Sequence, residues 1–448
     1  MTSQITFLRS AATLAFTTAF IMSSVGLAVA STNGQPQTEK SSAVSTHYRN
    51  LFHEIGISQE QINAHIAQTY TQLFHGDSHS QAVYFPSGQN SDGALAYIED
   101  IANQDVRTEG MSYGMMISVQ LDHKQEFDAL WNWANTYMKI TDPRNPSVGY
   151  FAWSMHTDGT PNSYGPAPDG EEYFVMSLYF AAHRWGNGKG IYDYKAQADH
   201  LLSLMRHHPN LSGEAPLRIH PNDPVTLTSH GHYTARSGPM MNPKKDMVYF
   251  VPGMVDGDFT DPSYHLPAFY ELWSRWGPAE DHAFWAQAAA ASRIFFVRAA
   301  NATTGLSPDY ADFDGRPNET RFNPASATFS SDSFRTASNW SVDQEWWGQN
   351  SQATALSDRL LTFFAKEGVH TFKSHYTLEG KPLTQSRSSG LVATTAVAVL
   401  ASALPPDRTR PFVEEFWNTP IPSGHYRYYD GLLYLLSLLH ASGQFRMW

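Results

Sequence analysis

The sequence predicts an all-α fold in which about twelve helices form a double ring, six inner and six outer. Apolar residues recur at helical spacing along most of the chain, and capping residues or glycines bound many of these stretches. Long loops join the helical stretches. Between residues 209 and 258 the composition changes: Pro, Gly and His become frequent, and short β-branched runs such as Val225–Thr228 appear. This region is predicted to be an irregular excursion with a small β-hairpin.

Local signals place the ends of several helices. Ser58 and Gln61 form a capping box ahead of a helix that Gly76 ends. Asp122 is predicted to cap a second helix and Asp169 a third. The predicted helices span 58–75, 110–121, 122–139, 170–185, 191–207, 261–276, 278–300, 333–346, 350–366, 389–403, 408–417 and 429–442.

The chain is large enough to bury a core without disulfide bonds. Of its 448 residues 42% are hydrophobic, 16% are charged and none is cysteine, which is typical of a globular protein. We expect one domain over residues 46–448, preceded by a flexible lead-in at 31–45 that is rich in Ser, Thr, Gln and Gly. A monomer is expected. Aromatic residues make up 13% of the chain, and they serve either a large core or a groove that stacks on sugars or bases.

The charge of the chain excludes some partners. The formal net charge is -12, whereas binding to nucleic acid needs a basic face. No run of Lys or Arg is long enough to bind an anionic membrane surface. A neutral substrate is therefore expected, with no nucleic acid and no membrane as partner once the signal segment is removed.

The first thirty residues resemble an export signal. Arg9 precedes an apolar stretch from Ala11 to Met22, and Ala28-Val29-Ala30 supplies a small-x-small cleavage pattern. We expect residues 1–30 to be a signal peptide and the mature protein to be secreted or periplasmic. A retained membrane anchor is the alternative, because the apolar zone is long.

Three acidic residues have surroundings that suit catalysis. Glu109 opens an apolar helix, where lost solvation raises the pKa of a carboxyl group and suits a general acid. The alternative is that Glu109 only complements the helix N-terminus. Asp169 could complete a capping box with Glu172, and Asp332 could cap another helix. Arg335, one turn after Asp332, could instead orient a substrate hydroxyl.

Other motifs are absent or incomplete. The sequence contains no Walker loop, no Gly-x-Ser-x-Gly elbow and no Rossmann glycine pattern. His230-Gly231-His232 is best explained by chance among 20 histidines, and Asp312-Phe313-Asp314-Gly315 lacks the Glu of a calcium loop. We therefore expect no cofactor and no metal ligands.

Taken together, the three acidic segments resemble glycoside hydrolase family 8. Glu109–Met116 is similar to the segment that carries the family's general acid, and Ala167–Glu171 is similar to its signature, with Pro168 and Glu171 as departures. Both departures are typical of the branch of reducing-end xylose-releasing exo-oligoxylanases. Further segments match that branch from about residue 45 to the end, namely 150–154, 261–267, 331–335, 416–420 and 427–430.

The resemblance implies an (α/α)6 barrel and an inverting enzyme that cleaves β-1,4-linked xylo-oligosaccharides or xylan. It implies that Glu109 is the general acid, that Asp332 is the base, and that Asp169 positions the sugar and stabilises the transition state. The substrate-binding residues that it implies are Trp153, Tyr264, Arg335, Arg387 and Tyr429.

One departure leaves the mode of cleavage open. Arg387 stands where the branch is expected to carry a histidine that recognises the reducing-end hydroxyl and blocks longer chains. Arginine can donate to the same hydroxyl, but it is longer and more mobile. The alternatives are endo-xylanase action, cellulase or chitosanase action within the family, a non-catalytic sugar-binding protein, and a polysaccharide lyase.

Overall fold

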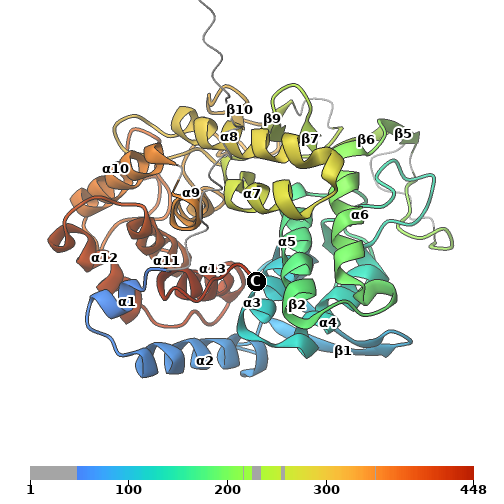
Figure 1. Cartoon of the computed structure of the whole chain (residues 1–448), viewed down its shortest axis with the longest axis horizontal. Helices are drawn as coiled ribbons and strands as arrows, with labels where there is room; N and C mark the ends of the chain where they lie inside the picture. The colour runs from blue at the N-terminus through green and yellow to red at the C-terminus, as the bar shows by residue number, and fades with distance from the viewer. Residues whose placement is uncertain (1–47, 215, 225–233, 254–257, 349) are drawn as a thin grey trace, which may run out of the picture. The chain divides into compact units, whose positions relative to one another are not determined.

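Thirteen α-helices dominate the part of the chain that the computed structural model describes, residues 48–214, 216–224, 234–253, 258–348 and 350–448 (Figure 1). The helices are α1 (Leu51–Glu54), α2 (Gln59–His75), α3 (Thr108–Leu121), α4 (Lys124–Trp133), α5 (Pro168–Trp185), α6 (Tyr194–His207), α7 (Pro267–Trp276), α8 (His282–Ala299), α9 (Phe334–Trp347), α10 (Ser351–Glu367), α11 (Ser389–Val397), α12 (Pro406–Asn418) and α13 (Arg427–Ala441).

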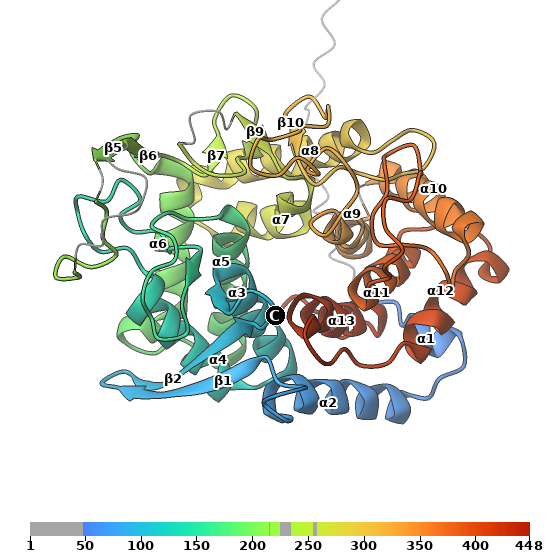
Figure 2. The ribbon, with the colours of Figure 1, turned by 180° about the vertical axis from the view of Figure 1, so that it is seen from behind.

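These helices form an (α/α)6 barrel, as predicted. The odd-numbered helices from α3 to α13 form the inner ring, and the even-numbered helices from α2 to α12 lie outside them (Figures 1 and 2). Each inner helix packs on an outer partner: α3 on α4, α5 on α6, α7 on α8, α9 on α10, α11 on α12 and α13 on α2. The first inner helix, α3, also packs on the last, α13, and this contact closes the ring.

The two rings differ in composition because the inner helices are buried, whereas the outer helices expose one face to solvent. The inner helices α3, α5, α11 and α13 bury nearly all of their residues and carry few charges. The outer helix α2 buries only one stripe, which includes Ile62, Ile66 and Leu73. This is the pattern of an amphipathic helix. The capping box of Ser58 and Gln61 at its start is confirmed.

Opposite ends of α3 face two different surroundings. Its first turn lies at the end of the barrel that gathers the acidic residues described below. At its last turn, Gln120 bonds to the C-terminal segment through Arg446 and through the indole of Trp448. The C-terminus thus fills the other end, and in Figure 1 it lies at the centre of the ring.

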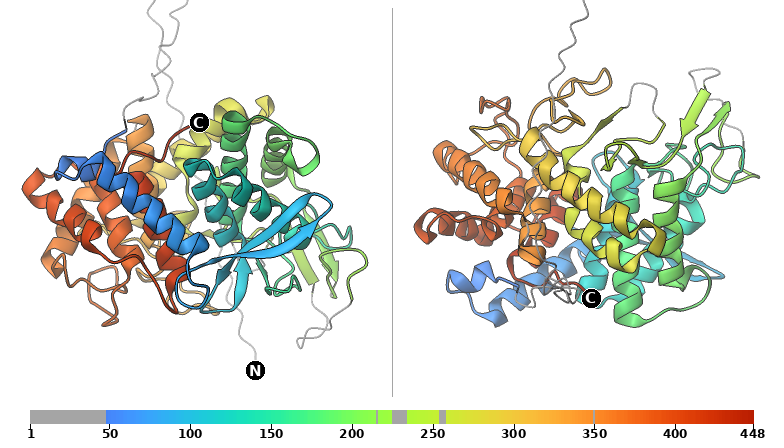
Figure 3. Two further views of the ribbon diagram at one scale, coloured as in Figure 1. Left: turned by 90° about the horizontal axis from the view of Figure 1, so that it is seen from below. Right: turned by 45° about the horizontal axis from the view of Figure 1, so that its top comes forward.

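In the described ranges, ten short strands lie in the loops. They are β1 (Tyr84–Asn90), β2 (Gly93–Asp100), β3 (Asp105–Arg107), β4 (Ser154–Met155), β5 (Leu211–Glu214), β6 (Thr234–Ser237), β7 (Met241–Asn242), β8 (Met247–Val248), β9 (Phe259–Thr260) and β10 (Ala311–Asp312). Strands β1–β4 form an antiparallel sheet that the sequence analysis did not predict, and β2 packs on α4 (Figure 2). The hairpin of β1 and β2 extends beside α2 in Figure 3. The excursion at 209–258 contains the β5–β6 and β7–β8 hairpins.

Three local predictions need correction. Asp122 does not cap α4: it ends α3 in the left-handed conformation, and its carboxylate accepts from Arg184 and Trp185. The predicted helix at 261–276 begins only at Pro267, after a 3₁₀ turn η3 (Pro262–Tyr264). The predicted helix at 122–139 is split, since α4 passes into a π-helical turn η1 (Ala134–Met138).

Some predictions fall outside the described residues. These are the signal peptide at 1–30, the lead-in at 31–45, the Val225–Thr228 run and the His230-Gly231-His232 pair. No helix in the described ranges is long and apolar enough to span a membrane.

Candidate active site

One arginine joins the three carboxylates that the sequence analysis singled out. Nη1 of Arg335, on α9, donates to Oε2 of Glu109 at 3.0 Å and to Oδ2 of Asp169 at 2.9 Å. Nη2 donates to Oδ1 of Asp332 at 3.2 Å. The Arg335 side chain is only 5% exposed, so water screens these charges weakly. Residues that are far apart in the sequence therefore form one charged cluster.

The fold explains why these residues meet. Glu109 lies in the first turn of α3 and Asp169 in the first turn of α5, while Asp332 comes two residues before α9. All three inner helices therefore begin at the same end of the barrel. Helix N-termini carry partial positive charge, which favours negative side chains there.

Glu109 has the properties of a general acid. Burial raises the pKa of its carboxyl group to about 7; Arg335 lowers that pKa, and Asp169 and Asp332 raise it. Its second oxygen, Oε1, accepts from the hydroxyl of Tyr428 at 2.9 Å. A carboxylic acid with a pKa near neutrality can hold a proton and release it during the reaction.

Asp332 is more exposed to solvent than Glu109. Its side chain is 31% exposed, against 15% for Glu109. The segment that carries it is held from two sides. Oδ1 of Asp309 accepts from the backbone of Ser330 and Ser333, and the Tyr429 hydroxyl donates to the carbonyl of Ser331 at 2.8 Å. Asp332 is thereby fixed while its carboxylate stays accessible to water.

Asp169 is buried and does not cap its helix. Its Oδ1 accepts from the adjacent Gly170 N–H at 3.0 Å, and Glu172 instead accepts from the hydroxyl of Tyr270. The capping-box alternative for Asp169 is therefore wrong, and Asp332 likewise makes no cap, since Ser333 precedes α9. Burial raises the pKa of the Asp169 carboxyl group, while Arg335 lowers it.

Two glycines allow the three helices to approach closely. A Cβ atom on Gly110 would lie 2.5 Å from Cε2 of Tyr428, and one on Gly170 would lie 2.4 Å from Cβ of Thr108. Gly110 thus lets α13 pack against the first turn of α3. Gly170 lets the first turn of α5 pack against the same turn of α3. These are the contacts that place Tyr428 and Asp169 beside Glu109.

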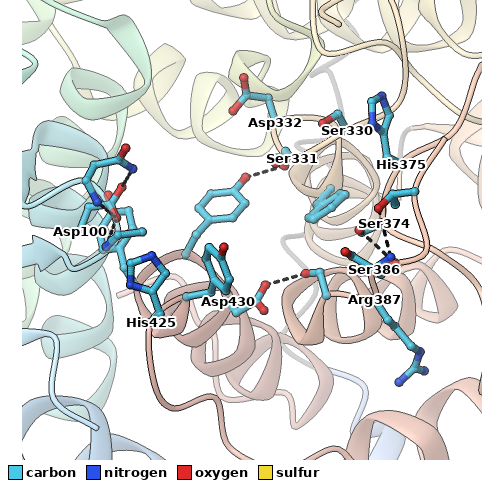
Figure 4. Close-up of a pocket in the computed structure, with 18 of the residues that line it drawn as sticks. Asp100, Ser330, Ser331, Asp332, Ser374, His375, Ser386, Arg387, His425 and Asp430 are labelled. Carbon is cyan, nitrogen blue, oxygen red and sulfur yellow. Dashed lines mark hydrogen bonds between the residues drawn. The ribbon is translucent and has the colours of Figure 1, made fainter. Parts of the chain in front are cut away.

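A cleft of about 760 Å³ opens beside the cluster (Figure 4). Both Glu109 and Asp332 line it. One part of its wall comes from the turn after β2 and the loop before α13, and another from the loop before α11. The lining residues are Asp100, Ala102, Asn103, Arg107, Glu109, Ser330, Ser331, Asp332, Phe334, Ser374, His375, Thr384, Ser386, Arg387, Ser388, His425, Tyr426, Tyr428, Tyr429 and Asp430.

Tyr264 and Trp153 stand close to this centre. The guanidinium of Arg335 lies over the Tyr264 ring at 5.6 Å. Trp153 is 38% exposed, the guanidinium of Arg107 lies over its ring at 5.6 Å, and its carbonyl accepts from the N–H of Thr108 at the start of α3. Trp153 therefore offers an exposed flat ring of the kind that stacks on sugars, whereas Tyr264 is buried.

Arg335 lies among several carboxylates. Its terminal nitrogens face carboxylates and one hydroxyl: besides the three above, Oδ2 of Asp261 lies 3.9 Å from Nη2, and Nη1 donates to the Tyr113 hydroxyl at 3.0 Å. Arg335 therefore holds Glu109, Asp169 and Asp332 together, and its contact with a substrate hydroxyl stays a prediction.

Arg387 bonds to the outer helix α12. This residue lines the cleft, but its Nη2 donates to Oε1 of Glu415 at 2.6 Å and to the carbonyl of Val369 at 3.1 Å. In Figure 4 its side chain points away from Asp332 and out of the cleft. Its Nη2 is thus bonded to Glu415 and Val369, and the role of Arg387 in binding substrate stays a prediction.

Four further residues belong to the site and were missed. Tyr113 lies 3.0 Å from Nη1 of Arg335, Tyr428 bonds to Glu109, Asp309 holds the Asp332 segment, and Asp261 is fully buried beside Arg335. Tyr113, Tyr428 and Asp261 lie in segments that resemble the family, which is a signal that could have found them. Asp309 has no local signal, because its role depends on a contact with another part of the chain.

A helical double ring with a buried acid and a water-accessible carboxylate in one cleft defines a glycoside hydrolase. Among the described residues, no group of three or more His, Cys, Asp or Glu side chains is arranged to hold a metal ion. A family model described as glycosyl hydrolases family 8 matches residues 90–206 and 247–443. The chain belongs to this family.

Its relatives include enzymes named for xylose release. Reducing-end xylose-releasing exo-oligoxylanase Rex8A from Paenibacillus barcinonensis is 41% identical over 90% of this chain and 97% of its own length. The reducing end xylose-releasing exo-oligoxylanase from Halalkalibacterium halodurans is 40% identical over 92% of this chain and 97% of its own length. A crystal structure described as a family 8 xylanase from Teredinibacter turnerae, a catalytic mutant in complex with xylohexaose, has a TM-score of 0.83. It is 47% identical over 89% of this chain and 97% of that one.

Proposed function

We propose that this protein hydrolyses β-1,4-xylosidic bonds of xylo-oligosaccharides with inversion at the anomeric carbon. The observation that carries the proposal is the placement of Glu109 and Asp332 on the two terminal nitrogens of Arg335, both facing one cleft. Inversion needs a protonated acid and an ionised base on opposite sides of the scissile bond, with room for a water between base and sugar.

Each carboxylate has a separate role in this reaction. Glu109 gives its proton to the leaving oxygen as the bond from that oxygen to the anomeric carbon breaks. Asp332 takes a proton from the water whose oxygen forms the new bond at that carbon. Asp169 lies next to Arg335 and Glu109, where its negative charge stabilises the oxocarbenium-like transition state.

Xylose release from the reducing end is the mode of cleavage that we propose. It is supported by two relatives of that name at 40% and 41% identity over nine-tenths of the chain. Endo-action on longer xylan is the second candidate. It is favoured by Arg387, whose guanidinium is bonded to Glu415 outside the cleft, and by the similarity to a xylanase.

Xylohexaose labelled at its reducing end separates these candidates. Early release of labelled xylose with unlabelled xylopentaose supports the exo mode, whereas labelled xylobiose and xylotriose support the endo mode. Proton NMR of the first products tests inversion, because an inverting enzyme releases the α-anomer from a β-bond. Failure to cleave xylohexaose would contradict the proposal and direct the search to glucan or chitosan.

We also propose that the protein acts outside the cytoplasm as a monomer after removal of residues 1–30. The support is the pattern of Arg9, the apolar stretch and Ala28-Val29-Ala30. Amino-terminal sequencing of the exported protein should begin at Ser31, and light scattering should give the mass of one chain. An intact N-terminus in the membrane fraction would indicate a retained anchor instead.

A further inference from the structure

Three acidic residues lie at the start of α5, and the proposed reaction uses only the first of them. Asp169 bonds to Arg335, whereas Glu171 and Glu172 are fully buried and have no role in that reaction. Glu171 also stands where the sequence departs from the family signature. Burying a carboxyl group is costly unless it is hydrogen-bonded, so the partner of Glu171 indicates what it holds.

Glu171 holds the segment that carries Trp153. Its Oε1 accepts from the backbone N–H of Phe151 at 3.0 Å, in a place where both residues are buried. The next two amides, those of Ala152 and Trp153, donate to backbone carbonyls. Of these three amides, only that of Phe151 depends on a side chain.

Trp153 lies beside the cleft with its ring open to solvent. The ring is 38% exposed, and the guanidinium of Arg107, which lines the cleft, lies over it at 5.6 Å. The Trp153 carbonyl accepts from the N–H of Thr108, directly before Glu109. A ring binds a sugar more tightly when its position is fixed beforehand, since ordering it during binding costs affinity. The backbone that holds Trp153 therefore affects sugar binding.

The Glu171 carboxyl group is a neutral hydrogen-bond acceptor. Burial raises its pKa well above the usual range; the Phe151 N–H lowers that pKa, and nearby Asp169 raises it. Among the described residues, its second oxygen, Oε2, has no hydrogen-bond partner. A protonated acid with one bonded oxygen is close to glutamine in shape and charge, so glutamine is the conservative replacement.

We propose that Glu171 is a positioning residue that fixes the Trp153 ring for stacking on a xylose unit, through its bond to the backbone of Phe151. Because Glu171 is fully buried, it touches neither substrate nor reacting atoms, so it affects KM and leaves kcat nearly unchanged. The start of α5 thus contributes to the site twice, since Asp169 bonds to Arg335 and Glu171 supports the sugar contact. This inference rests on the proposed function, because it concerns how the same site binds xylo-oligosaccharides.

The test is a double-mutant cycle with xylohexaose as substrate. Glu171→Met keeps the size of the side chain but removes the acceptor, so KM should rise about fivefold while kcat changes less than about twofold. Trp153→Ala should raise KM about tenfold. Because both changes disturb one contact, the double variant should stay near tenfold, whereas independent effects would give about fiftyfold. Glu171→Gln keeps the acceptor and should leave KM as it was.

Glu172→Met is the matched control. Glu172 is the next residue of α5 and is equally buried, but its Oε1 accepts from the hydroxyl of Tyr270. Its effect on KM should therefore multiply with that of Trp153→Ala. Thermal unfolding shows whether each variant is folded. Glu171→Asp, which shortens the acid by one methylene, is the second variant if Glu171→Met does not fold, and its rise in KM should also vanish in the Trp153→Ala background.

Several results overturn the inference. They are multiplied effects of Glu171→Met and Trp153→Ala, an unchanged KM in either single variant, and an equal rise in KM for Glu171→Gln. Calorimetry of xylohexaose binding in the Glu109→Gln background measures the same ratios as Kd values without turnover. A protein that binds xylohexaose with these ratios but does not cleave it contradicts the proposed function alone, so the two failures are distinguishable.

Discussion

Nη1 of Arg335 lies 3.0 Å from Oε2 of Glu109, yet the pKa of Glu109 is raised to about 7. A single ion pair of this length usually lowers the pKa of a carboxyl group. Here burial outweighs the pair, and Arg335 also shares its charge with Asp169 and Asp332. The arginine therefore gathers the acids without fixing all of them in the ionised form.

Replacing Glu109 by Gln should lower kcat on xylo-oligosaccharides by about 10²–10⁴-fold, because the amide cannot donate a proton to the leaving oxygen. The melting temperature should change little, since Gln keeps the shape of the side chain. The measurement is steady-state kinetics together with thermal unfolding. Retained activity with a large loss of stability would mean that Glu109 only complements the start of α3.

The pH dependence should report the Glu109 carboxyl group. The acid must be protonated, so kcat/KM should fall as pH rises through about 7, by about tenfold per unit. The same group affects stability. A raised pKa favours the protonated folded state, so this contribution is complete below the usual pKa of Glu and is lost as pH rises through about 7. The stability of Glu109→Gln relative to the unchanged protein should therefore improve between pH 5 and about pH 8, and a constant difference would contradict the assignment.

Removal of the base should slow the reaction without weakening binding. Asp332→Asn should reduce kcat by about 10²–10⁴-fold, because the amide cannot accept the proton of the attacking water. KM should stay close to its original value. Rapid turnover in this variant would rule out Asp332 as the base.

The Tyr428 hydroxyl should tune the acid. It donates to Oε1 of Glu109, which stabilises the ionised carboxylate. Tyr428→Phe should therefore raise the pKa of Glu109 and move the alkaline limb of the pH profile upward. A profile that keeps its position would show that this bond does not affect the acid.

Close packing at Gly110 should be essential for the same contact. A Cβ atom there would lie 2.5 Å from Tyr428, so Gly110→Ala should cost about 1–3 kcal/mol of stability and lower kcat. Gly165→Ala is a suitable control, because the nearest atom to its added Cβ lies 3.9 Å away. Equal effects of the two changes, measured by urea unfolding, would argue against a special role for Gly110.

The sequence predicted elements whose signals are local and missed those that depend on distant contacts. The capping box at Ser58 and the apolar spacing of α2 need only nearby residues, and both predictions were confirmed. The sheet of β1–β4 pairs segments on both sides of α3 and α4, so local spacing did not indicate it. Asp122 has the composition of a cap, but Arg184 and Trp185 from α5 determine its actual contacts.

In the candidate site, too, the residues with a local signal in the sequence were predicted, and those that depend on distant contacts were not. Family resemblance singled out Glu109, Asp169 and Asp332, and the structure places all three on Arg335. The direction in which Arg387 points could not be predicted, because it depends on Glu415 from another helix. Asp309 was missed for the same reason, since it acts through the backbone of a segment 21 residues further along the chain.

The contact that closes the ring joins residues from the two ends of the barrel sequence. Glu109 lies on the first inner helix and its partner Tyr428 on the last, 319 positions later. During synthesis, every helix but one can be complete while the acid still lacks its neighbour. The proposed catalytic site is therefore assembled only after the last inner helix has been made.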